Sequence, residues 1–241
     1  MKFENTEVWG FEHALRGMRN PKNSWNKSDS RWEFVEDITI INPNDEVKYV
    51  VGDNDMKLAK TLINGGSEHR KFLRQIFVSV DITAPLYWWK EFDTYKVGTV
   101  ANSTSTMHKI ASNPITLDCF ETDDLSNVFF DDEPQNDLGF GGDVEYFICR
   151  LEKLRQKYLE TNNKIYWKVL IRWSPESWLQ MRTVTMNYEN LLAMCSKGQR
   201  RYHKLNEWSG IDDPNKPNFI SWAKTLPYSE EFIFIKEDNN E

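Results

Sequence analysis

The spacing of apolar residues along the chain predicts a mixture of strands and helices. Residues 75–83 form the clearest predicted strand, because apolar residues occupy every second position from Ile76 to Ile82, with Ser79 and Asp81 facing the other way. Strands are also predicted within residues 34–51, around a turn at 42–45, and near residues 166–171 and 183–186. The fold is therefore expected to contain a sheet.

Apolar residues three and four positions apart predict helices elsewhere. The longest is expected to begin at Asp143, with apolar residues recurring over positions 144–158 and charged residues, Arg155 among them, mainly on the outer side. Further helices are predicted at residues 11–19, 53–63, 86–94, 188–194 and 219–225. Asp53 or Asn54 can cap the second of these, and Pro85 favours the start of the third.

These elements show no tandem strand-helix-strand repeat, which predicts an α+β or mixed α/β fold in a single domain, residues 1–241. Residues 118–142 are predicted to be a loop-rich insertion. The glycines at 139–142 lack the spacing of a dinucleotide fingerprint, and we expect a turn there. The tail, residues 236–241, is expected to be disordered.

Charge and composition exclude several classes of function. A net charge of −7 argues against a nucleic-acid polymer as the main partner, because such surfaces need clustered cations, whereas a mononucleotide needs only a few. The chain has no apolar run long enough to cross a bilayer, and its start lacks the order of a signal peptide. We therefore expect a soluble, cytoplasmic protein without a membrane partner.

Cysteines and histidines do not predict a metal site. The three cysteines are odd in number and widely spaced, and we expect buried free thiols. No two of the four histidines lie three or four residues apart, so a built-in metal centre is not expected. No nucleophile elbow or glycine-rich phosphate loop occurs either.

Residues 91–110, EFDTYKVGTVANSTSTMHKI, contain a pattern of polar residues that resembles one enzyme signature. Flavin-dependent thymidylate synthases of the ThyX type carry Arg-His-Arg-x-x-Ser-x-Asn-Glu-x-Ser-x-Arg-Tyr in the loop that holds flavin and deoxyuridylate. Alignment on Asn102 also matches Ser105 and places residues 95–97 at Arg-His-Arg. Counting without a gap from Pro85 places residues 94–96 there instead, so two registers remain open.

Other segments resemble the same family in the same order. Residues 69–75 fall at His-x-Ser/Thr-Pro-Phe-Glu-His and keep the first histidine, and residues 171–175 resemble Ala-Arg-x-x-Leu-Pro, one residue shorter. Residues 185–191 match Thr-x-Asn-x-Arg-Ser-Leu at three positions, with Glu189 at the arginine. Residues 199–208 are similar to the closing Arg-x-x-x-His-x-Gln-Trp. The resemblance covers roughly residues 10–226.

The resemblance implies a central, mostly antiparallel sheet flanked by helices, and a homotetramer with its site between subunits. The implied reaction is reductive methylation of deoxyuridylate (dUMP) to thymidylate with FAD, with methylene-tetrahydrofolate and NADPH as co-substrates. The aromatic run at 86–92 would suit a subunit interface. The implied cofactor-binding residues are His69, Lys96, Asn102 and Asn187, and the implied substrate-binding residues are Ser105, Arg172 and Arg200.

Each of these residues also has a plain structural reading. Asn187 could cap the following helix, His69 could be a half-buried structural histidine, and any arginine, Arg182 included, could belong to a surface ion pair. An anion at Glu189 should oppose a phosphate at that spot. Three hypotheses therefore stay open: a ThyX-like enzyme acting on a pyrimidine nucleotide, a non-catalytic binding or regulatory protein with this fold, and another enzyme that reuses the cleft.

Overall fold

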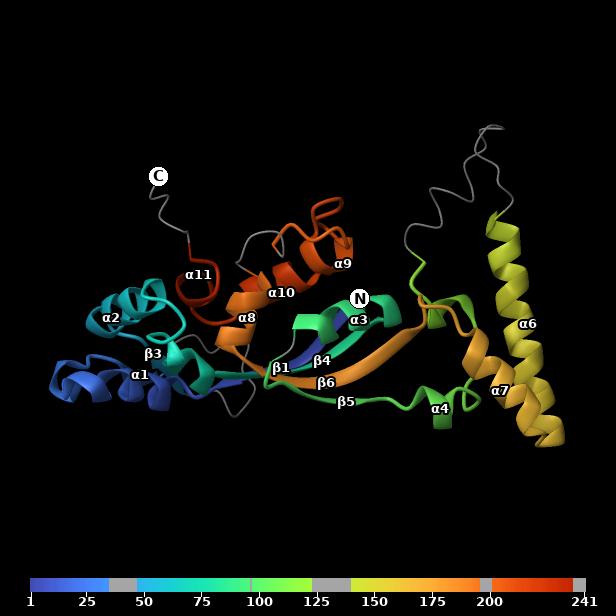
Figure 1. Cartoon of the computed structure of the whole chain (residues 1–241), viewed down its shortest axis with the longest axis horizontal. Helices are drawn as coiled ribbons and strands as arrows, with labels where there is room; N and C mark the ends of the chain where they lie inside the picture. The colour runs from blue at the N-terminus through green and yellow to red at the C-terminus, as the bar shows by residue number, and fades with distance from the viewer. Residues whose placement is uncertain (35–46, 96, 123–139, 196–200, 236–241) are drawn as a thin grey trace. The chain divides into compact units, whose positions relative to one another are not determined.

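The computed structural model describes residues 1–34, 47–95, 97–122, 140–195 and 201–235. Its main sheet has the order β1-β4-β6-β5, formed by β1 (Lys2–Trp9), β4 (Phe77–Pro85), β6 (Leu179–Asn187) and β5 (Val100–Ser103) (Figure 1). This antiparallel sheet is flanked by helices, which confirms the expected fold class.

Contacts group the chain into two compact units. The first comprises Met1–Glu4, Asp81–Thr94 and Ala101–Thr183, and the second comprises Asn5–Val80, Tyr95–Val100 and Val184–Glu241. All four strands of the main sheet contribute residues to both units. The single-domain expectation stays a prediction, and the units are described separately below.

Strand β4 follows the alternation seen in the sequence. Val78, Val80 and Ile82 are buried, whereas the residues between them are partly exposed, which confirms the predicted inward face. The strand runs two residues later than predicted, because Lys71–Gln75 forms a 3-10 helix, η3. Strand β4 ends at Pro85, and α3 (Leu86–Tyr95) begins at the next residue.

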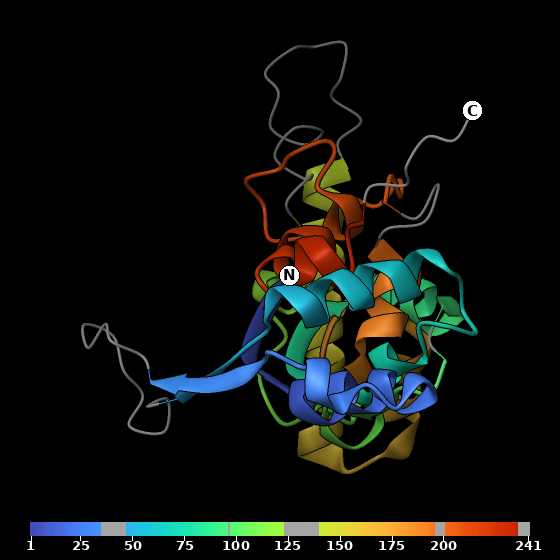
Figure 2. The same ribbon diagram turned by 90° about the vertical axis from the view of Figure 1, so that its left-hand side faces the viewer.

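In the second unit, helices occupy most of the predicted positions: α1 (Phe11–Arg19), α2 (Asp53–Asn64), α8 (Tyr188–Cys195) and α10 (Phe219–Lys224). The helices α9 (Asn206–Ser209) and α11 (Ser229–Phe232) were not predicted, nor were the 3-10 helices η1 (Asn20–Lys22) and η2 (Trp25–Lys27). Strands β2 (Arg31–Phe34) and β3 (Val47–Val50) form an antiparallel pair, and the predicted turn at 42–45 lies outside the described residues. Figure 2 shows α1 beside α2, with β2 extending away from both.

The predicted cap of α2 was wrong. Gly52 is the N-cap residue and provides no side chain, so the carboxylate of Asp29 accepts hydrogen bonds from the backbone N–H groups of Asn54 (2.9 Å) and Asp55 (3.1 Å). Asp55 itself is fully buried and accepts a 2.5 Å hydrogen bond from Arg19. A residue distant in sequence therefore caps this helix. The local sequence around the helix start could not predict that cap.

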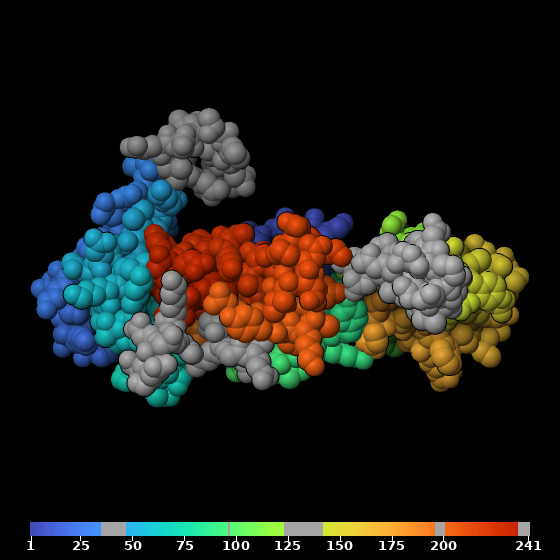
Figure 3. Space-filling model, turned by 90° about the horizontal axis from the view of Figure 1, so that it is seen from above, coloured from blue at the N-terminus to red at the C-terminus, as the bar shows by residue number. Residues whose placement is uncertain are grey.

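Aromatic rings form much of the core of the second unit. Phe11 makes edge contacts with Tyr188 and Tyr228, and the buried ring of Trp208 packs against Phe219. The Trp208 contact joins α9 to α10, which both reach the surface of this unit in the space-filling view (Figure 3). Such ring pairs contribute beyond the area that they bury.

In the first unit, α6 (Phe140–Thr161) packs on α7 (Lys164–Trp173). Two predictions fail here. The expected strand at 166–171 is part of α7, and Gly141 and Gly142 lie in α6 rather than in a turn. Asn163 caps α7 by accepting a 3.0 Å hydrogen bond from the Ile165 N–H, and the helix buries Leu170, so capping and packing override the strand preference of its β-branched and aromatic residues.

Arg155, on α6, also departs from its predicted exposed position, because the residue is only 9% exposed. The guanidinium donates two 2.7 Å hydrogen bonds to Glu152 and one of 3.2 Å to the Ala111 carbonyl. These hydrogen bonds from Arg155 lower the pKa of Glu152 to about 2. The bond to Ala111 connects α6 to the segment that follows α4 (Thr106–Lys109).

The aromatic run at 86–92 lies inside the first unit. Trp88, Trp89 and Phe92 are fully buried and contact one another, so these rings are not available for the subunit interface that we expected of them. No helix among the described residues is long and apolar enough to span a membrane.

Candidate functional site

The part of the signature-like segment that lies in the first unit, residues 101–109, runs along β5 and into α4; we call it the signature-like loop. Thr104 anchors it to β6, because its backbone N–H donates to the Met181 carbonyl at 2.9 Å. Gln180 adds a second anchor by donating to the Thr104 carbonyl at 3.0 Å. Asn102 lies on β5, where all four residues are exposed, so its amide is accessible to a ligand.

Ser105 is the N-cap of α4. Its Oγ accepts a 3.2 Å hydrogen bond from the His108 N–H and lies 2.8 Å from Nδ1 of the same histidine. The imidazole is exposed, in a stretch where the family pattern has Arg-Tyr. The serine thus shapes the loop and orients His108, while either side chain stays within reach of a ligand.

Arg172 occupies the last turn of α7 and is exposed. Among the residues that the structure describes, it has no ion-pair partner. Helix α7 is tied to the loop by Trp167, whose Nε1 donates to the Met107 carbonyl at 2.8 Å. Arg172 therefore offers an unengaged guanidinium from an element that contacts the signature-like loop.

Arg182, the other candidate arginine of this unit, already has structural partners. Its Nη1 lies 3.3 and 3.4 Å from the two carboxylate oxygens of Asp93, and its Nε donates to Gln180 at 3.0 Å. Its guanidinium also lies 4.3 Å from the centre of the Trp89 ring. The guanidinium of Arg182 therefore contacts a carboxylate, an amide and an aromatic ring of the protein itself. These contacts support the interpretation of Arg182 as an ion-pair residue.

In the second unit, Asn187 acts as a helix cap. Its Oδ1 accepts from the Asn190 N–H at 3.0 Å, while Asn190 Oδ1 accepts from the Asn187 N–H at 3.0 Å. The Nδ2 of Asn190 donates to the Val97 carbonyl at 2.6 Å. The family-like asparagine therefore closes the first turn of α8, as its plain structural reading predicted.

Glu189, the next residue but one, is bound by two arginines from the segment that resembles the histidine motif. Nε of Arg70 lies 3.3 Å from its Oε1, and Arg74 contacts both of its oxygens, with Nη2 at 3.4 Å from Oε1. Burial opposes ionisation of Glu189, but the hydrogen bonds from Arg74 and Arg70 outweigh it and lower its pKa. His69, at the start of this segment, is exposed rather than half-buried.

The contacts of Glu189 with Arg70 and Arg74 were not predicted from the sequence, although the charges at two of these positions gave a signal. The two family patterns have a glutamate at position 74 and an arginine at position 189, and this chain has the opposite charges at both. The structure shows that these two positions form an ion pair. An exchange of charges at paired positions preserves the attraction between them.

Two predicted site residues, Lys96 and Arg200, lie outside the described residues. Of the others, Asn102, Ser105 and Arg172 belong to the first unit, and His69 and Asn187 to the second. The described residues contain no cluster of ligands that could hold a metal ion. Cys119, Cys149 and Cys195 are free thiols, but only Cys195 is buried, against our expectation for all three.

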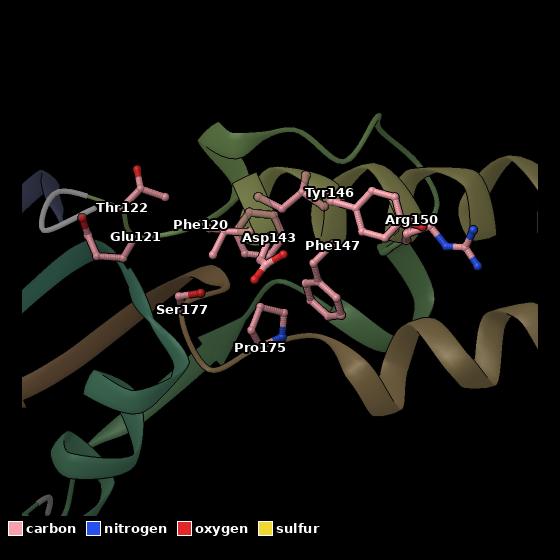
Figure 4. Close-up of a pocket in the computed structure, with 11 residues that line it drawn as sticks. Phe120, Glu121, Thr122, Asp143, Tyr146, Phe147, Arg150, Pro175 and Ser177 are labelled. Atoms are coloured by element: carbon pink, nitrogen blue, oxygen red, sulfur yellow. The ribbon is translucent and has the colours of Figure 1, made fainter. Parts of the chain in front are cut away.

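The first unit also contains a half-open pocket of about 630 Å³ that none of the predicted residues lines. It lies between the start of α6, the residues after η4 (Leu117–Cys119) and the turn that follows α7 (Figure 4). The close-up shows Asp143 among the rings, with Arg150 towards one end and Thr122 towards the other. The apolar part of its wall consists of Phe120, Val144, Tyr146, Phe147, Ile148 and Pro175.

No protein-family model matches the sequence, and no curated protein matches it. Solved structures do match the fold. ThyX from Helicobacter pylori complexed with FAD and dUMP superposes with a TM-score of 0.59 at 17% identity, over 97% of this chain and 98% of that one. A second structure of the same enzyme with FAD and dUMP gives 0.59 at 16% identity and covers 97% of each chain.

This chain has a ThyX-like fold. A UMP/dUMP methylase, PolB from Streptomyces cacaoi bound with 5-Br dUMP, also superposes on it, with a TM-score of 0.52 at 12% identity over 95% of this chain and 93% of that one. The ThyX-like fold inferred from the motifs is confirmed, and it extends over almost the whole chain.

Proposed function

We propose that this protein binds a pyrimidine nucleotide beside FAD and catalyses the reductive methylation of dUMP to thymidylate, or a closely related reaction. The observation that carries the proposal is the near-complete match of its fold to ThyX complexed with FAD and dUMP. The similarity to a UMP/dUMP methylase supports a pyrimidine nucleotide as the ligand class, because that protein also has this fold.

The side chains of the described residues fit such ligands in kind. A dinucleotide cofactor needs donors for its diphosphate, and the exposed His69 of the second unit is a candidate for one of them. In the first unit, the accessible Asn102 and Ser105 suit the carbonyl and hydroxyl groups of a pyrimidine nucleotide. Arg172 provides a planar donor for its phosphate or its ring carbonyls.

The protein's own part in this reaction is binding and orientation. A reduced flavin, when bound, supplies the hydride, methylene-tetrahydrofolate would supply the carbon, and NADPH would supply the reducing equivalents. Arg172 would hold the nucleotide in one orientation, and Asn102 and Ser105 would restrict the loop around it. Correct orientation alone can account for a large part of an enzyme's rate enhancement.

A specific observation favours a second candidate, a non-catalytic nucleotide-binding or regulatory protein with this fold. The family pattern places arginines in the loop, where this chain has Tyr95, Val97 and Met107 in one register. Loss of two or three such arginine contacts, each about 1.5 to 3 kcal/mol for a charge-assisted hydrogen bond, would weaken nucleotide binding by orders of magnitude. Flavin binding distinguishes the two candidates.

The first prediction is that the purified protein, given excess FAD and then desalted, keeps the visible absorption of bound oxidised flavin. The same sample should convert dUMP to thymidylate when methylene-tetrahydrofolate and NADPH are added, as followed by chromatography. A heat-denatured sample treated in the same way provides the control. A colourless protein that still binds dUMP in calorimetry would contradict the enzyme and support the non-catalytic candidate.

A further inference from the structure

In the second unit, the cluster of Arg70, Arg74 and Glu189 contains two cations that share one carboxylate. Its two cations and one anion leave one net positive charge. The neighbouring exposed residues Glu68 and Lys71 carry opposite charges and cancel in this count. A net charge held close to the protein surface attracts an anion.

Burial shows where the excess charge is accessible. The side chains of Arg70 and Glu189 are only 11% and 15% exposed, whereas that of Arg74 is 51% exposed. Arg70 and Glu189 therefore form the inner part of the cluster, and Arg74 carries the positive charge that solvent can reach.

Arg74 also retains hydrogen-bond donors. Its Nε and Nη2 point to Glu189, and its Nη1 has no acceptor among the residues that the structure describes. A guanidinium presents five N–H donors in a rigid fork, so one edge can bind a carboxylate while another faces a ligand. Because Glu189 already fixes the side chain, binding an anion here would cost little additional conformational entropy.

We propose that Arg74 binds a phosphate group of the ligand, with Glu189 and Arg70 as positioning residues that hold its guanidinium. This inference rests on the proposed function, which supplies two phosphate-bearing ligands, FAD and dUMP. Both offer oxyanions that a guanidinium binds strongly. It revises the expectation that Glu189 opposes phosphate at this spot, because the carboxylate is neutralised by Arg70 and orients Arg74.

The test is calorimetric titration of the full chain with FAD, riboflavin, dUMP, deoxyuridine and pyrophosphate. We expect Arg74→Gln to weaken at least one of FAD and dUMP, and also pyrophosphate, by about 10-fold or more, the usual value of a charge-assisted contact. Riboflavin and deoxyuridine, which lack phosphate, should change by less than about 2-fold. Arg74→Lys should recover part of the loss, because it keeps the charge without the fork.

Lys71→Gln is the matched control, because it removes one exposed positive charge from the same 3-10 helix without touching Glu189. We expect it to change phosphate binding by less than about 3-fold, as for an unspecific surface charge. Thermal melts accompany the titrations, and Arg74→Gln should stay folded because Arg70 still neutralises Glu189. An effect on FAD alone would identify the flavin diphosphate as the group bound, and an effect on dUMP alone the nucleotide phosphate.

The inference is overturned if FAD or dUMP binds the unmutated protein and Arg74→Gln leaves both affinities unchanged. It is also overturned if riboflavin and deoxyuridine weaken as much as their phosphorylated counterparts, or if Lys71→Gln has the same effect. Arg74-dependent binding of pyrophosphate without binding of FAD or dUMP would support the inference and contradict the proposed function. Binding of none of the three would contradict both.

Discussion

Single polar residues that match the family patterns have structural duties in this chain. Ser105 caps α4, and Asn187 closes the first turn of α8 through its exchange of hydrogen bonds with Asn190. Serine and asparagine are preferred at helix starts because their side chains satisfy N–H groups that have no partner within the helix. A match in residue type at these positions therefore supports the common fold more strongly than it supports a ligand.

Arg172 differs, because it is exposed and no described residue pairs with it. We predict that Arg172→Ala weakens dUMP binding by about 1.5 to 3 kcal/mol, the value of a charge-assisted hydrogen bond, without lowering the melting temperature. Arg172→Lys should recover only part of the loss. Calorimetric titration with dUMP and thymidylate measures both.

Lys168→Ala is the matched control for this prediction, since Lys168 is an exposed cation one turn earlier on α7. Lys168→Ala should change the dUMP affinity by less than about 2-fold, because a neighbouring surface charge that makes no contact with the ligand is largely screened by solvent. Equal effects of the two alanine variants would remove any special role from Arg172, and unchanged affinity in Arg172→Ala would remove it from the site.

At the scale of elements, an ion pair within α6, between Glu152 and Arg155, also binds the segment that follows α4, because Arg155 donates to the Ala111 carbonyl. Glu152 accepts hydrogen bonds from Arg155 and also from the Ile115 N–H at 2.8 Å. Since its folded pKa of about 2 lies below its ordinary value of 4.5, the folded state binds fewer protons than the unfolded state between these values. This contribution to stability is therefore present above about pH 4.5 and is lost as the pH falls towards 2.

We predict that Glu152→Gln lowers the free energy of unfolding at pH 6 by about 1 kcal/mol, a value reduced for the partial solvation of the pair. The difference from the unmutated protein should shrink as the pH falls towards 2, where Glu152 is protonated. Urea unfolding at a series of pH values measures it. Glu160→Gln, which removes an exposed partner of Lys157, should change stability little. A difference that does not depend on pH would refute the assigned cause.

At the scale of the whole molecule, the family resemblance implies a homotetramer. The buried rings at 86–92 no longer argue for it, but α7 exposes an apolar stripe of Ile165, Val169 and Trp173, with Ile165 and Trp173 59% and 66% exposed. Residues four apart on a helix share one face, so this stripe would suit contact with another copy.

We predict that light scattering gives a mass near four times 28.5 kDa. Trp173→Glu should shift the mass towards smaller species, because it places a charge in an apolar contact. Trp25→Glu, at a half-exposed tryptophan of the other unit, should not. A single species of 28.5 kDa for the unmutated protein would exclude the tetramer.

The sequence by itself determined the elements whose signals are local. The alternation through β4, the apolar spacing in α1, α2 and α6, and the order of the family-like segments led to the fold class and to the ThyX-like resemblance. These signals suffice because strand and helix periods depend only on neighbouring residues.

Only the tertiary structure decided the features that depend on residues far apart in the chain. The capping of α2 by Asp29, the burial of Arg155 with Glu152, and the helical state of residues 166–171 each depend on packing. The same holds for the candidate site. Arg74 and Glu189 are 115 positions apart, and a sequence pattern shows their charges but not that the two side chains meet. Folding brings them together, and their contact changes Glu189 from an expected obstacle to phosphate binding into the proposed support of Arg74.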